Sequence, residues 1–179
     1  PPPSPPLPSP PPLSTCQSWG DPHIISEGLP FSGAEFSKHG IGFFDFYSRP
    51  DELWIQTFHC AMTTNRDMSG NAGLLVRSAN HSVTVLGTEW KVHGDEGTVH
   101  DTFDIEQLDD RVVIRHSATS ATVESVNVTQ PFMQSRYFQQ IRLAMPAQQR
   151  TTEPPYGLCM AANATAVRQL EPSEVLFPE

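Results

Sequence analysis

From residue 40 onward, short apolar runs are separated by turn-forming residues about every eight to twelve positions. Residues 52–60 carry apolar side chains on both faces, which is typical of a central strand. Apolar and polar positions alternate along residues 137–145, as expected for a long strand with one buried face. The pattern predicts strands at 42–47, 52–60, 74–77, 82–86, 89–92, 103–107, 111–116, 119–128 and 137–145. It also predicts a polar loop from Thr63 to Asn71 and a short helix within residues 160–172. The fold class is therefore all-β.

The first thirteen residues contain only Pro, Ser and Leu. Each proline ring fixes φ and restricts the residue before it, so this segment is predicted to form an extended polyproline II rod of roughly 40 Å. The segment is interpreted as a spacer, a ligand for a proline-binding groove, a glycan-coated stalk or a plain linker. Its Ser-Pro-Pro pattern resembles the hydroxyproline-rich shafts of algal and plant matrix glycoproteins. The resemblance implies hydroxylation and O-glycosylation at Pro2, Pro3, Pro5, Pro6, Pro8, Pro10, Pro11 and Pro12. We assign residues 1–13 to this shaft and residues 14–179 to one β domain.

The charge balance excludes some classes of partner. Eleven Lys and Arg residues stand against 20 Asp and Glu residues, for a net charge of −9, and no basic patch is visible, so we expect no nucleic-acid partner. No apolar run approaches the roughly 18 residues that a spanning helix needs, so we expect no membrane insertion. The chain opens within a proline-rich stretch, without an initiator Met or a signal peptide, and we interpret it as a piece of a longer protein.

Several signals favour an extracellular or cell-surface location. Asn80, Asn127 and Asn163 each begin an Asn-x-Ser/Thr triplet, the acceptor pattern for N-glycosylation, although unmodified surface Asn is the alternative. The chain has three cysteines, an odd number that in a secreted protein indicates one disulfide and one leftover thiol.

The two ends of the β domain resemble the von Willebrand factor type D (VWD) domain. The N-terminal part of the resemblance is Cys16, then Gly-Asp-Pro-His at 20–23, Phe-Ser-Gly at 31–33, and the glycine-aromatic run 40–43; the C-terminal part is Gly-Leu-Cys at 157–159. The resemblance covers roughly residues 16–165 and implies an antiparallel β-sandwich closed by a disulfide between Cys16 and Cys159. Cys60 is then unpaired, either as a buried small apolar residue or as the site of an intermolecular disulfide.

The chain departs from this family where many members bind calcium. Ser32 replaces the Asp of Phe-Asp-Gly, and no carboxylate follows Cys159 in the loop 160–165. Calcium needs six to eight oxygen ligands, with carboxylates supplying most of the affinity. Glu27, Ser32 and Asn163 are weak candidates, so we expect no calcium site and no other cofactor. The acidic cluster Asp95, Glu96, Asp101 and Asp104 is a second candidate, interpreted as a solvated hairpin face.

One catalytic motif remains. In some VWD domains the Asp-Pro bond of Gly-Asp-Pro-His cleaves itself, which here implies attack by Asp21 on its own carbonyl, departure of the Pro22 nitrogen and proton transfer by His23. The alternative is a structural turn. The seven histidines lack metal-ligand spacing, and no nucleophile elbow, phosphate loop or dinucleotide fingerprint is present. We therefore expect no enzyme.

These observations predict a structural module of a secreted glycoprotein in a matrix, cell wall or surface or flagellar filament. Its expected partners are copies of itself or other extracellular glycoproteins. The alternatives are a module that binds a carbohydrate or protein through exposed Trp or Tyr, and an autoproteolytic domain.

Overall fold

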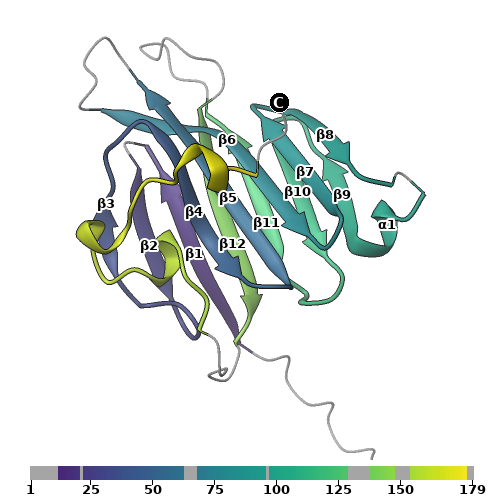
Figure 1. Ribbon diagram of the computed structural model, residues 1–179, viewed down its shortest axis with the longest axis horizontal. Helices are drawn as coiled ribbons and strands as arrows, with labels where there is room; N and C mark the ends of the chain where they lie inside the picture. Colours follow the sequence, from purple (N-terminus) through teal and green to yellow (C-terminus); the bar gives the residue numbers. More distant parts are fainter. Residues whose placement is uncertain are drawn as a thin grey trace, which may run out of the picture.

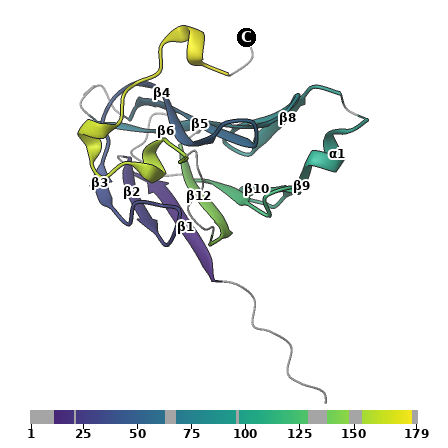
Figure 2. The same cartoon turned by 60° about the horizontal axis from the view of Figure 1, so that its bottom comes forward.

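The structure is a computed structural model that describes residues 12–20, 22–62, 68–95, 97–128, 138–147 and 154–176. Two antiparallel sheets pack face to face, as Figures 1 and 2 show, so the predicted all-β sandwich is confirmed. The first sheet has seven strands: β1 (Leu13–Trp19), β2 (His23–Glu27), β3 (Glu35–Ser37), β9 (Phe103–Gln107), β10 (Arg111–His116), β11 (Thr122–Asn127) and β12 (Gln139–Pro146). The second has five: β4 (Gly42–Arg49), β5 (Leu53–Ala61), β6 (Ser69–Ser78), β7 (His81–Leu86) and β8 (Glu89–His93).

The seven-stranded sheet is formed by strands from the two ends of the chain. The chain lays down β1 to β3, forms the second sheet as the consecutive run β4-β5-β6-β7-β8, and returns as β9 to β12. The order in the first sheet is β3-β2-β1-β12-β11-β10-β9, so the first and last strands of the chain pair with each other. Cys16 lies opposite Leu143, and the carbonyl of Pro12 accepts a hydrogen bond from Ala147 N at 3.1 Å. Because β1 is bonded on both sides, it is an interior strand and not a loose terminus.

The core lies between the inner faces of the two sheets. The alternation predicted along residues 137–145 is confirmed for residues 139–145, since Ile141, Leu143 and Met145 of β12 are completely buried; residue 137 lies outside the described residues. The strand predicted at 52–60 is the second of five in its sheet, next to an edge strand. Its inner residues Leu53 and Ile55 are also fully buried.

The predicted loop from Thr63 to Asn71 was wrong at its end, because β6 already begins at Ser69. Ser69 and Asn71 are almost completely buried. Asn71 Nδ2 donates to Ser18 Oγ of β1 at 2.9 Å and to the carbonyl of Gln139 at 3.3 Å. The Asn71 amide nitrogen is therefore bonded to partners on the opposite sheet, and Ser69 Oγ accepts from Gly40 N, between β3 and β4, at 3.1 Å. A polar sequence that resembles a loop when taken alone thus forms part of a buried strand.

The C-terminal segment, residues 154–176, contains no α-helix. The short helix expected there takes the form of three single-turn 3₁₀ helices, η1 (Leu158–Met160), η2 (Ala164–Ala166) and η3 (Pro172–Glu174). A one-turn helix α1 (Val99–Thr102), which the sequence pattern did not predict, precedes β9. No helix in the described ranges has the length and apolar character needed to cross a bilayer. The polyproline prediction falls almost entirely on residues 1–11, outside the described part of the chain.

Candidate functional site

The C-terminal segment is fixed to the sandwich by a disulfide bond between Cys16 of β1 and Cys159 of η1, which confirms the predicted pair. Both cysteines are completely buried, and their Cα atoms are 5.7 Å apart. Gly157, which precedes η1, has φ 114°, and a Cβ atom there would lie 2.9 Å from the carbonyl oxygens of Asp45 and Phe46. Only glycine permits this conformation and this approach to β4.

The loop after Cys159 is held by hydrogen bonds where calcium would be expected from the resemblance. Ser32 Oγ donates to the carbonyl of Ala161 at 2.9 Å and lies 3.1 Å from Ser26 Oγ. Asn163 Oδ1 caps η2, accepting from the backbone nitrogens of Thr165 and Ala166, both at 3.1 Å. These oxygens are occupied within the protein and include no carboxylate, so the residues present do not fit a calcium ion.

The other residues considered as metal ligands either bond to groups of the protein or lie apart from one another. Within the described ranges, no group of three or more His, Cys, Asp or Glu side chains is placed to hold a metal. Asp95 Oδ1 accepts from Gly97 N at 3.0 Å, and Asp104 pairs with Arg115 at 3.1 Å. Glu27 is exposed at the end of β2, and Glu96 lies outside the described residues.

The ammonium group of Lys38 reaches the loop that follows Cys159. Lys38 Nζ donates to the carbonyls of Ala164 at 3.0 Å and Val167 at 2.6 Å, and it lies 5.8 Å from the centroid of the Phe44 ring. An ammonium group that bonds two carbonyls joins the segment after β3 to the C-terminal segment. Sequence reasoning missed Lys38, because a single lysine between two short strands carries no local signal.

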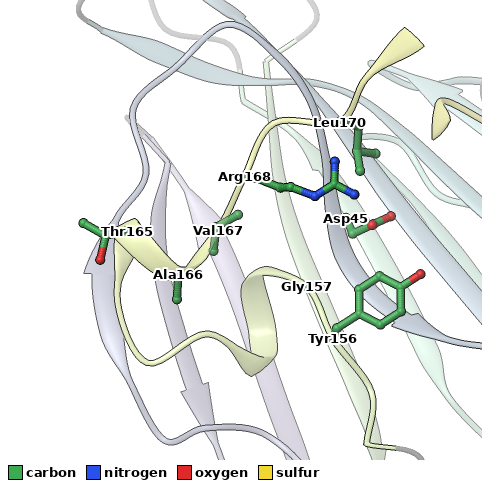
Figure 3. A pocket seen from close by; sticks show the side chains of 8 residues that line it. All are labelled: Asp45, Tyr156, Gly157, Thr165, Ala166, Val167, Arg168 and Leu170. Carbon is green, nitrogen blue, oxygen red and sulfur yellow. The ribbon is translucent and has the colours of Figure 1, made fainter. Parts of the chain in front are cut away.

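A groove lies between the C-terminal segment and the outer face of the five-stranded sheet. Two adjoining cavities of about 290 and 330 Å³ share four lining residues. These four are Asp45, Tyr156, Arg168 and Leu170; Trp54, Gln56, Arg77 and Glu174 also line the second cavity. Figure 3 shows the guanidinium of Arg168 extending toward Asp45, with the Tyr156 ring on the other side of that carboxylate. The groove therefore combines aromatic surface with both signs of charge.

Gln56 of β5 joins the C-terminal segment to the sheet by hydrogen bonds. Its side chain is 2% exposed, and its Nε2 donates to Asp45 Oδ1 at 3.2 Å and to the carbonyl of Glu174 at 3.0 Å. Its Oε1 accepts from Leu176 N at 2.8 Å. Every hydrogen bond of this amide is intramolecular, so Gln56 supports the groove and is not available to a ligand.

The charged side chains of the groove interact with one another. Burial raises the pKa of Asp45, against the opposing effect of the hydrogen bond from Gln56. Arg168 and Glu174 form a two-point ion pair on the exposed rim, and the hydrogen bonds from Arg168 lower the pKa of Glu174 to about 2. Tyr156 is 47% exposed, and its backbone pairs with Ser48 of β4. The aromatic face and the partly buried carboxylate remain for contact with a ligand.

The predicted self-cleavage site is only partly within the described residues, because Asp21 lies outside them. His23 Nδ1 lies 3.1 Å from Ser37 Oγ, and its Nε2 lies 2.9 Å from Glu35 Oε1. Both ring nitrogens thus face side chains of β3, which gives His23 a structural role in joining β2 to its neighbour.

The remaining predicted sites are dispersed over the surface. Asn80 and Asn163 are exposed, and Asn127 is half-buried at the end of β11. Cys60 is the free cysteine, half-buried in β5, and burial raises the pKa of its thiol. A raised pKa makes the reactive thiolate scarcer.

Comparison with known proteins gives no match for this chain, either to a protein-family model or to a curated sequence. The assignment to the VWD family remains a proposal.

Proposed function

We propose that this chain is a non-catalytic structural module of a secreted extracellular glycoprotein, one that assembles with copies of itself or with other such glycoproteins in a matrix, wall or surface or flagellar filament. The observation that carries the proposal is the closure at Cys16. This residue lies in the strand directly after the proline-rich segment and is bonded covalently to Cys159. The point where a shaft would enter the domain is thus held by a covalent bond as well as by backbone pairing.

The position of β1 supports a mechanical interpretation. β1 pairs with β2 on one side and with β12 on the other, and the disulfide bond attaches its middle to the C-terminal segment. A force that enters through residues before Leu13 is shared by two ladders of hydrogen bonds and a covalent bond. The resemblance to the VWD domain agrees with this interpretation, because its implied fold and disulfide pairing are the ones found here.

The test is to express the 179-residue chain through a secretory pathway and to examine the oxidised, glycosylated product by sedimentation velocity and negative-stain electron microscopy. We expect concentration-dependent oligomers or filaments. A product that stays monomeric up to about millimolar concentration, where even weak contacts are populated, would overturn the proposal. Comparing reducing with non-reducing electrophoresis would also show whether Cys60 forms an intermolecular disulfide.

A second candidate function is saccharide binding, and the groove favours it. Aromatic side chains stack on the apolar faces of sugar rings while charged and amide groups bond the hydroxyls, and a site of this kind is concave with few polar groups. Trp54, Tyr156, Asp45 and Arg77 supply that combination. A glycan array with the wild-type chain, Trp54→Ala and Tyr156→Ala would test it. A hit lost in both variants but kept in Leu108→Ala, a change at an exposed apolar residue outside the groove, would support binding; no reproducible hit would exclude it.

A further inference from the structure

Among the described strands, β8 is an edge of the five-stranded sheet, and one of its side chains departs from the expected alternation of buried and exposed positions. It is the last strand of the order β4-β5-β6-β7-β8, and Glu89, Trp90 and Lys91 are all exposed. Val92 packs against the core, on the same face as the fully buried Val83 and Val85 of β7. By strict alternation Trp90 shares that inner face, yet it is 41% exposed. The core is therefore open along this edge.

The turn between β7 and β8 determines which backbone groups of β8 are free. Leu86 and Glu89 are opposite each other across the two-residue turn Gly87-Thr88, and Gly87 has φ 64°. In a two-residue hairpin the flanking residues exchange both hydrogen bonds, and the pairs then alternate. Glu89 and Lys91 consequently bond to β7, whereas the N–H and C=O groups of Trp90 and Val92 point away from the sheet. These groups form a template for another strand.

We infer that β8 pairs antiparallel with β8 of a second copy of this chain, about a two-fold axis at Trp90, so that two five-stranded sheets become one continuous sheet. The inference rests on the proposed assembly function and names the surface that performs it.

The charges of β8 select this register over the others. Antiparallel pairing of the free backbone groups allows centres at residue 90, 91 or 92. A centre at Trp90 places Glu89 of each copy opposite Lys91 of the other, in two symmetric ion pairs on the outer face. A centre at Lys91 places the two Lys91 side chains opposite each other, and a centre at Val92 places Lys91 opposite His93. Opposite charges in directly facing positions stabilise a pair, and like charges destabilise it.

The same register uses the apolar surface that the monomer leaves open. On the inner face, Trp90 of one copy meets Trp90 of the other, and their exposed parts are removed from water. The contact is isologous, since one patch serves both copies. Such a contact closes into a dimer, and between five-residue strands it is weak by itself.

The test is a charge-reversal cycle on the full 179-residue chain, with self-association measured by sedimentation equilibrium. Glu89→Lys and Lys91→Glu each turn two attractive pairs into two repulsive ones, so we expect each to weaken dimerisation about tenfold or more. The double variant E89K/K91E restores both pairs and should dimerise within about threefold of the wild type. An equimolar mixture of the two single variants should form the heterodimer, because each lysine then faces a glutamate. Both positions are exposed, and unchanged thermal unfolding would verify that the monomer fold is kept.

Asp109→Lys is the matched control, since Asp109 is exposed in the turn between β9 and β10 and the substitution changes the net charge by the same amount as Glu89→Lys. It should leave dimerisation unchanged within about twofold. If the chain associates but the single variants behave like this control, the edge pairing is overturned and the proposed function stands through another surface. If the wild-type chain does not associate at all, both are overturned.

Discussion

Replacing Cys16 and Cys159 by alanine removes the covalent closure and leaves every strand in place. The two cysteines are 143 residues apart, and on the chain-entropy model a bridge of that length stabilises the folded state by about 5 kcal/mol at 25 °C. A domain of this size has a total stability of roughly 5–15 kcal/mol, so the variant should lose a third or more of it. The corresponding fall in the melting temperature is about 10–20 °C.

The assay is urea unfolding of the double alanine variant and its parent, both carrying Cys60→Ala so that no thiol can exchange. Hydrogen exchange adds a local readout. β1 keeps its pairs with β2 and β12, whereas residues 157–170 lose their covalent anchor, so protection should fall mainly in the C-terminal segment. A stability loss below about 2 kcal/mol would refute the entropic argument, and a loss of protection centred on β1 would refute the structural one.

Three further predictions concern single residues. Lys38→Met removes the charged donor from two carbonyls and should lower the free energy of unfolding by about 1–3 kcal/mol in urea. The control is Lys91→Met, measured at a concentration where the chain is monomeric, which should have an effect near zero; equal effects would contradict the role of Lys38. Burial lowers the pKa of His59 in the folded state to about 3, below its usual 6.5, so the unfolded state takes up the proton first. The contribution of a neutral, buried His59 to the free energy of unfolding is therefore complete above pH 6.5 and falls by about 1.4 kcal/mol per pH unit between pH 6.5 and about 3. NMR should find the His59 ring of the folded protein neutral at pH 5. Titration of this ring near pH 6.5 would contradict the prediction. In Gly157→Ala the new methyl group meets two carbonyl oxygens and the backbone φ is strained, so the free energy of unfolding in urea should fall by more than about 2 kcal/mol. In Gly33→Ala, where φ is 71° and the space around the Cβ is open, it should fall by about 1 kcal/mol. Similar losses in the two variants would show that the close approach at Gly157 is unimportant.

The sequence located much of the β-architecture because its signals are local. Alternation along 139–145 and the aromatic run 42–47 depend only on side-chain order, and both correspond to strands. The Cys16–Cys159 pair was also predicted, through the resemblance of the two short segments that carry these cysteines. Where polar residues occupy a strand, as at Ser69 and Asn71, the prediction failed, because their partners come from distant segments: Ser69 accepts from Gly40 N, and Asn71 donates to Ser18 of β1.

The candidate site depended on tertiary structure. Asp45, Trp54, Arg77, Tyr156 and Arg168 come from three strands and the C-terminal segment, and only the path of that segment over the sheet brings them together. No spacing along the chain encodes such a groove. The contact of Lys38 with the loop after Cys159 is of the same kind: the sequence showed that residues 160–165 contain no carboxylate, but the ammonium that bonds this loop is 126 residues away from Ala164.

The sequence by itself therefore indicated the all-β class, most of the strands from β4 onward and the lack of carboxylates in residues 160–165, since each depends on residue identity within a short window. The tertiary structure decided which edge stays open, what fills the space after Cys159 and where a ligand would fit. These depend on contacts between segments that only the packing of the two sheets brings together.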